Sequence, residues 1–172
     1  MLAYNIQMSF ITDNLSEGEE VRIYAKIHPI IFYDTIVWLL LSIMLIAYGN
    51  FYVEASSGLI RYLSIGLLLI AFIRLCKAGI YKYSTEVAVT NKRIIAKFGL
   101  IEREVIELPL MKIESVIIDQ SVLERVLGSG SVGVRGTGTG MAPVRYIDNP
   151  LEFRNALNEA IAEARGSYQK EI

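Results

Sequence analysis

The chain has 172 residues, of which 53% are hydrophobic, and its formal net charge at pH 7 is −1. This near-neutral charge argues against a nucleic-acid-binding protein, because no excess of basic residues is available to neutralise phosphates. One cysteine and one histidine exclude an internal disulfide and a thiolate metal cluster and leave little for a histidine site, so we expect no metal and no cofactor.

Residues 1–29 are expected to form a cytoplasmic N-terminal segment. This segment is rich in acidic residues and lacks the basic start and small-residue cleavage pattern of a signal peptide. His28, next to Pro29, stands at the beginning of the first apolar stretch. We predict that His28 caps this boundary; the alternative is a ligand-binding histidine.

Two apolar stretches follow, residues 30–49 and about 59–80, and together they predict a transmembrane helical hairpin over residues 30–81. About 20 apolar residues at 1.5 Å rise match a bilayer core of about 30 Å. Asp34 is the only charged residue within 30–49. The alternative interpretation is a buried core helix, although such a helix usually carries more polar residues along its length.

Basic residues predict the orientation of this hairpin. The linker between the stretches offers only Arg61 at its edge, whereas basic residues accumulate before the first stretch and after the second: Arg22, Lys26, Arg74, Lys77, Lys82, Lys92 and Arg93. The positive-inside rule therefore places both termini in the cytoplasm. Asp34 could pair with Arg74 or Lys77 across the hairpin, and Cys76 is expected to be a passive interfacial residue.

From residue 83 onward the pattern becomes that of short β-strands. Strands are expected at residues 84–90, 93–99, 100–110, 112–119, 131–135 and 142–147, with a short helix at 121–127 that ends at Gly128. A final helix should begin with Asn149 as N-cap, Pro150 at the first position and Glu152 as the capping-box acid. Its apolar face comprises Phe153, Leu157, Ala160, Ile161 and Ala164.

Several separated marks in this second half resemble the bacterial pleckstrin-homology (PH-like) domain family, membrane-flanked type. They are Thr90-Asn91-Lys92-Arg93, Gly99-Leu100, Leu108-Pro109-Leu110, Lys112-Ile113, Asp119-Gln120-Ser121, Leu127-Gly128, Gly130, Gly136-Thr137-Gly138 and Asn149-Pro150. The resemblance implies an α+β membrane protein: the hairpin, then a strongly bent antiparallel sheet or barrel over residues 82–165 with a C-terminal capping helix, and a tail at 166–172. It implies no known reaction, and fold alone does not transfer a function.

The stretch LGSGSVGVRGTGTG, residues 127–140, contains the string G-x-G-x-x-G. A dinucleotide site needs a strand, then the glycines, then a helix, whereas here a short helix precedes the glycines and a strand follows. We therefore expect these glycines to serve bends and turns of a coiled sheet. A third interpretation stays open, in which backbone N–H groups beside Arg135 and Arg145 hold an anion such as a lipid phosphate.

The sequence shows no catalytic constellation, so we expect no enzyme. The first hypothesis is a membrane-anchored protein-interaction module, an accessory or assembly subunit of a bacterial inner-membrane complex that binds a protein partner or its own copies. The alternative is a sensor of anionic lipid headgroups at the cytoplasmic leaflet. Candidate anion contacts are Lys82, Lys92, Arg93, Arg135, Gly136, Gly138 and Arg145.

Overall fold

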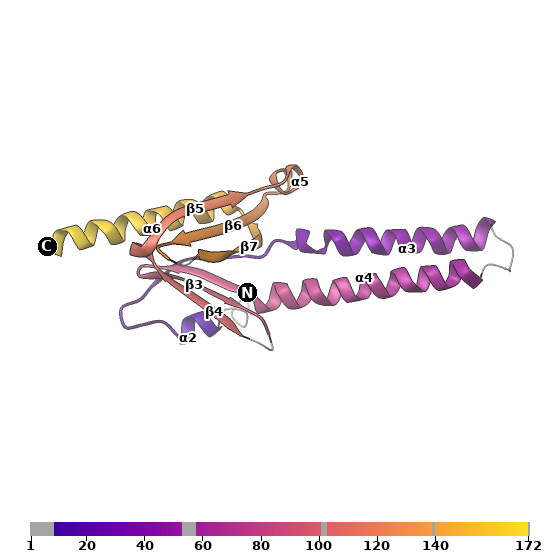
Figure 1. Cartoon of the computed structure of the whole chain (residues 1–172), viewed down its shortest axis with the longest axis horizontal. Coiled ribbons are helices and arrows are strands. Elements are labelled where there is room, and N and C mark those ends of the chain that lie inside the picture. The colour runs from indigo at the N-terminus through magenta and orange to yellow at the C-terminus, as the bar shows by residue number, and fades with distance from the viewer. Residues whose placement is uncertain (1–8, 53–57, 101–102, 139, 172) are drawn as a thin grey trace. The chain divides into compact units, whose positions relative to one another are not determined.

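The computed structural model describes residues 9–52, 58–100, 103–138 and 140–171. The chain divides into two compact units. One is a helical unit, Ile31–Ile80, and the other is an α+β unit built from the chain on both sides of it (Figure 1). The α+β unit is therefore discontinuous in sequence.

The helical unit consists mainly of α3, Tyr33–Tyr52, and α4, Gly58–Ser84, whose last turn reaches into the α+β unit. A short 3-10 helix, η1 (Pro29–Phe32), leads into α3. Both long helices have the length and apolar composition needed to cross a membrane, and 11% of the apolar window of each is buried. Such open apolar helices differ from the core helix of a soluble protein, which is mostly buried.

Polar contacts join α3 to α4 within the helical unit. Asp34 pairs with Arg74, which confirms one of the two pairings considered from the sequence. The Ser42 hydroxyl donates to the Ser64 carbonyl oxygen over 3.1 Å, in a buried position. Because each of these donors has an acceptor on the facing helix, the antiparallel pairing has a defined register.

The first sheet of the α+β unit has four antiparallel strands in the order β1-β2-β3-β4. These are β1 (Val21–Ala25), β2 (Glu86–Thr90), β3 (Arg93–Phe98) and β4 (Glu104–Pro109). The structure differs here from the expected division of the chain, which set residues 1–29 apart. Residues 21–25 pair with β2 and form an edge strand of the sheet, so the hairpin is inserted between two adjacent strands.

The second sheet has three antiparallel strands, β5 (Ile113–Asp119), β6 (Ser129–Gly136) and β7 (Gly140–Asp148). A 3-10 helix, η2 (Leu110–Lys112), connects β4 to β5, and the short helix α5 (Val122–Val126) lies between β5 and β6. The extension of β1 meets β7 through a bridge between Ile27 and Ile147. This bridge closes one corner between the two sheets.

The core lies between the two sheets and α6, Pro150–Glu171 (Figure 1). The apolar face predicted for this helix is confirmed, because its members pack against buried side chains of both sheets: Phe153, Leu157, Ala160, Ile161 and the partly buried Ala164. The helix begins at Pro150 as predicted, and the Asn149 carbonyl oxygen accepts from the Phe153 N–H, as the carbonyl of an N-cap residue does. Asn149 itself has φ 48°. A reciprocal capping box is present at α5, between Ser121 and Glu124.

A second, smaller cluster covers part of the first sheet. The helix α2, Ser9–Asp13, buries Ile11 against Ala88 and Ile95. No helix was predicted here, since five residues are too few for a periodic pattern to emerge. The N-terminal region thus contributes both an edge strand and a covering helix to the α+β unit.

The glycine run is used for close packing and for turns, as expected from its context. Gly128 ends α5 with φ 74°, a conformation that favours glycine. A Cβ added to Gly136 would lie 2.8 Å from Leu108 Cδ1 and 2.9 Å from the Lys112 carbonyl oxygen, so no side chain fits there. The run therefore lets β6 approach the corner between β4 and β5.

Candidate functional site

Strand β7 contacts both segments of the α+β unit that border the hairpin in sequence. On one side, the His28 N–H donates to the Tyr146 carbonyl oxygen over 2.6 Å, and the Asp148 N–H donates to the Lys26 carbonyl oxygen over 2.8 Å. On the other side, the Arg145 N–H donates to the Tyr81 hydroxyl oxygen over 3.2 Å. Residues 145–148 therefore lie where the chain leaves the α+β unit and where it returns.

His28 has the capping role predicted for it. Its Nδ1 accepts a hydrogen bond from the Ile30 N–H over 3.1 Å, at the beginning of η1. The imidazole thus satisfies one of the backbone donors that a helix start leaves unpaired.

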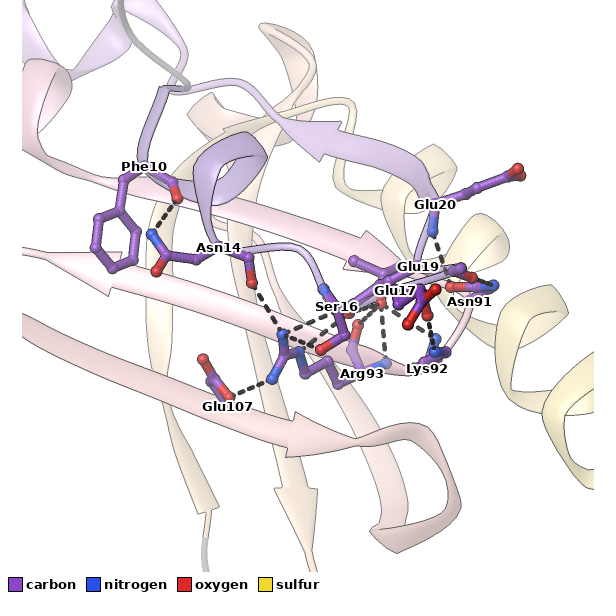
Figure 2. Close-up of polar contacts among 12 residues, drawn as sticks. Phe10, Asn14, Ser16, Glu17, Glu19, Glu20, Asn91, Lys92, Arg93 and Glu107 are labelled. Carbon is purple, nitrogen blue, oxygen red and sulfur yellow. Dashed lines mark hydrogen bonds and ion pairs between the residues drawn. The ribbon is translucent and has the colours of Figure 1, made fainter.

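A network that we call the N-terminal clamp joins residues 14–20 to residues 90–93, at the turn between β2 and β3 (Figure 2). Its centre is Glu19, whose side chain is fully buried and 2.9 Å from Arg93 Nη2. The Glu19 carboxylate also accepts from the Ser16 N–H and from the Thr90 hydroxyl. The Asn91 side chain adds two further hydrogen bonds. Its NH2 group donates to the Gly18 carbonyl oxygen, and its Oδ1 accepts from the Glu20 N–H.

The clamp keeps Glu19 ionised. Burial by itself raises the pKa of this carboxyl group, but the Ser16 N–H, the Thr90 hydroxyl and the Arg93 guanidinium together hold the pKa below its ordinary value. The charged form is favoured because hydrogen-bond donors and an opposite charge surround it in a site closed to water.

Two of the predicted anion contacts, Lys92 and Arg93, already donate to acceptors within the chain. Arg93 donates to Glu19 and Glu107 and keeps only 22% of its side chain exposed. Lys92 Nζ donates to the Glu17 carbonyl oxygen over 2.7 Å. Lys82 is in the last turn of α4. The sequence could not indicate Glu17 and Glu19 as the partners of Lys92 and Arg93, because both lie more than 70 positions earlier in the chain.

Arg135 and Arg145, in contrast, are brought together on the outer face of the second sheet. They line a depression of about 270 Å³ that we call the sheet hollow, formed by Ile117, Asp119, Ser131, Gly133, Val134, Arg135, Pro143 and Arg145. Both guanidinium groups are exposed, and neither makes an ion pair with any residue in the described part of the chain. The predicted contacts Gly136 and Gly138 do not line it.

The register explains the shape of the sheet hollow. Ile117 lies opposite Gly133, and Asp119 lies opposite Ser131, on neighbouring strands. A Cβ on Gly133 would be 3.7 Å from Pro143 Cβ, which is an ordinary contact distance, so a side chain would fit at this position. Because Gly133 has no side chain, the middle of the hollow stays open. The hollow is therefore floored by backbone in its middle and bordered by charged and polar side chains.

A second surface feature was not foreseen from the sequence. The short helix α5 was predicted, but its side chains are unusually open for apolar residues: Val122 is 79% exposed and Val126 78% exposed. Together with Leu123 and Leu127, which are also exposed, they form what we call the α5 apolar face. A second depression, of about 370 Å³, lies beside it and is lined by Gly128, Leu151 and their neighbours.

Among the residues that the structure describes, no group of three or more His, Cys, Asp or Glu side chains is placed to hold a metal ion. Many of the described polar side chains serve instead in the N-terminal clamp, in capping, in the sheet hollow and in pairs such as Lys97 with Glu86. The arrangement offers surfaces for binding, with donors and apolar groups presented on the α+β unit.

The comparison with protein families matches residues 34–161 to the bacterial PH domain. The chain belongs to the bacterial PH domain family. The family assignment agrees with the two bent antiparallel sheets and the capping helix, and it confirms the resemblance expected from the sequence. The match to the bacterial PH domain begins inside α3, so it includes the apolar hairpin. No curated protein and no solved structure matches the chain.

Proposed function

We propose that this bacterial PH domain protein is a membrane-anchored interaction module that binds a protein partner, as an accessory subunit of an inner-membrane complex. PH-like domains generally act as protein or lipid interaction modules and are typically non-catalytic. The α3–α4 hairpin is the proposed anchor, and the α+β unit is the proposed binding part. Both termini lie in the cytoplasm in this proposal, as the distribution of basic residues predicts.

The anchor is supported by the openness of the two helices. Their exposed apolar side chains, such as Met44 at 72% and Phe72 at 63%, would be costly to leave in water. Insertion into a bilayer would remove this cost. The ion pair between Asp34 and Arg74 would reduce the cost of placing these two charges in the membrane.

The observation that carries the protein-partner proposal is the α5 apolar face. A small helix held in place by a capping box, with Val122 and Val126 almost completely open, is not needed for the core. Apolar side chains clustered in this way on a domain surface mark an interaction site. A helix laid into an apolar groove of a partner is a common form of such recognition.

The test is co-purification of the tagged full chain from native membranes in mild detergent, comparing the wild type with the double variant V122S/V126S. We expect a defined protein to be recovered with the wild type and at least about tenfold less of it with the variant, because each valine that the partner buries contributes about 1.5 kcal/mol or more. The matched control is L100S, which alters an exposed leucine in the loop after β3. Equal recovery with V122S/V126S and wild type, or recovery of no protein, would contradict the proposal.

A further inference from the structure

We infer that the sheet hollow is a binding site for a phosphate-type oxyanion, held between Arg135 and Arg145. This goes beyond the proposed protein-partner role, since it concerns another surface and another ligand. The ligand chemistry is that of a phosphate oxyanion, whose two sources are a lipid headgroup and free phosphate.

The first argument is the spacing of the two arginines. Arg135 stands on β6 opposite Ser115, and Ser131 stands four residues earlier on the same strand, roughly 14 Å away by strand geometry. Arg145 belongs to the neighbouring part of β7, next to the residue that pairs with Val132. The two arginines therefore approach the hollow from opposite ends, and their long side chains can converge on a group above Gly133.

The second argument is the availability of donors. The N-terminal clamp shows what this chain does with an arginine that it uses for structure: Arg93 is mostly buried and surrounded by acceptors. Arg135 and Arg145 have exposed side chains and no ion-pair partner in the described residues. Planar guanidinium groups match the oxygens of phosphate in bidentate geometry, and the Ser131 hydroxyl adds a third donor at the lining.

The third argument is size and charge. A volume of about 270 Å³ lies at the low end for a small-molecule site and suits a phosphorylated headgroup better than a large cofactor. The lining carries two arginines and one aspartate, a net charge of +1. Asp119 opposes an anion, so this site should bind more weakly than one lined by arginines alone.

The position of Arg145 favours a headgroup as the source. Its backbone N–H is bonded to Tyr81, the residue that follows directly on the apolar stretch ending at Ile80. In a membrane-anchored chain, Arg145 is thus bonded to the residue that follows the anchor in sequence, and anionic headgroups are concentrated at the membrane surface. This choice of source rests on the proposed anchor, whereas the oxyanion site itself does not.

The test uses the full chain in an uncharged detergent, with two probes. Inorganic phosphate is titrated while the unfolding temperature is followed, and phosphatidylglycerol or phosphatidylcholine is added while bound lipids are counted by native mass spectrometry. We expect phosphatidylglycerol to bind in preference to phosphatidylcholine, and R135Q/R145Q to weaken this binding about tenfold or more, because two charge-assisted contacts are lost. The control R103Q removes an exposed positive charge outside the hollow and should leave binding unchanged.

Two further variants separate this site from general attraction of anions to a positive surface. G133V fills the floor of the hollow without changing the charge and should weaken binding, whereas D119N removes the opposing carboxylate and should strengthen it about threefold or more. Stabilisation by inorganic phosphate that is lost in R135Q/R145Q would support the site with free phosphate as its source.

Three results would overturn the inference: no response to either probe, equal loss of binding in R103Q and R135Q/R145Q, or unchanged binding in both G133V and D119N. Failure of this site would leave the protein-partner proposal standing, because that proposal is tested by V122S/V126S. Conversely, recovery of a protein partner by R135Q/R145Q at the wild-type level is expected whether or not an anion binds.

Discussion

Both carboxylate oxygens of Glu19 accept hydrogen bonds. Its carboxylate accepts from Ser16, Thr90 and Arg93, and its side chain has no exposed surface. Burying a charge is costly unless a partner and hydrogen bonds compensate for it, and here both are present. The clamp therefore attaches the segment before β1 to the turn between β2 and β3 through one carboxylate.

Replacing Glu19 with Gln should lower the free energy of unfolding by about 1–3 kcal/mol, because the Arg93 guanidinium loses its negatively charged partner and one of the two oxygens to which it donates. The effect should depend on pH. The pKa of Glu19 in the folded chain lies below the ordinary 4.5, so its contribution is fully present above that pH and is lost as the pH falls through the lower, folded-state value.

The measurement is denaturant unfolding of wild type and E19Q between pH 7 and pH 3. The two should differ most at neutral pH and converge in acid. The control is E20Q, which alters the adjacent and exposed carboxylate and should leave stability nearly unchanged. A constant difference across this pH range would show that the ionised carboxylate is not the stabilising group.

At the scale of elements, β1 is the part of the α+β unit that comes before the hairpin in sequence and pairs with β2. Its residues Ile23 and Ala25 lie opposite Val89 and Val87, which are buried in the core. A fragment that begins after the hairpin lacks this strand and leaves the edge of β2 unpaired. Unpaired edges next to apolar faces favour aggregation.

We therefore expect residues 82–172 alone to aggregate or to remain incompletely folded. A chain in which residues 9–28 are joined to residues 81–172 by about six glycine and serine residues should fold, because residues 28 and 81 both bond to adjacent positions of β7. Circular dichroism and hydrogen exchange of β2 distinguish the two, with protected β2 amides expected only in the joined chain. Equal protection in both would show that β1 is dispensable.

Sequence reasoning succeeded where structure is local and failed where a partner is distant. The face of α6 and the strands from β2 to β7 follow from periodicity and turn residues close to each element. Arg135 and Arg145 were also expected near one another, because they lie on the adjacent antiparallel strands β6 and β7. The strand β1 and the contact of Arg93 with Glu19 could not be predicted, since the two partners in each case lie on opposite sides of the hairpin sequence.

For the whole molecule, the inserted hairpin restricts membrane topology. Residues 21–28 and 81–172 belong to one folded unit, so both ends of the hairpin must lie on the same side of any bilayer that it enters. A single crossing is incompatible with the sheet, and only two crossings or none allow β1 to pair with β2.

This constraint, combined with the proposed cytoplasmic location of both termini, predicts the labelling pattern of single cysteines in a Cys76→Ser background. A membrane-impermeant maleimide applied to intact spheroplasts should label G58C, at the start of α4, and should not label E17C or S167C until the membrane is permeabilised. Labelling of E17C and G58C together before permeabilisation would contradict the proposed topology.

The pairing of β1 with β2 also fixes an order of events during synthesis. The residues of β1 leave the ribosome first, but the strand that they pair with follows only after both apolar helices have been made. The first strand therefore has no β2 to pair with until both helices have been made. In the proposed membrane-anchored chain, a hairpin that crossed only once would leave β2 on the opposite side of the bilayer from β1. Such a chain would keep its sheet open, and quality-control proteases could recognise it by that defect.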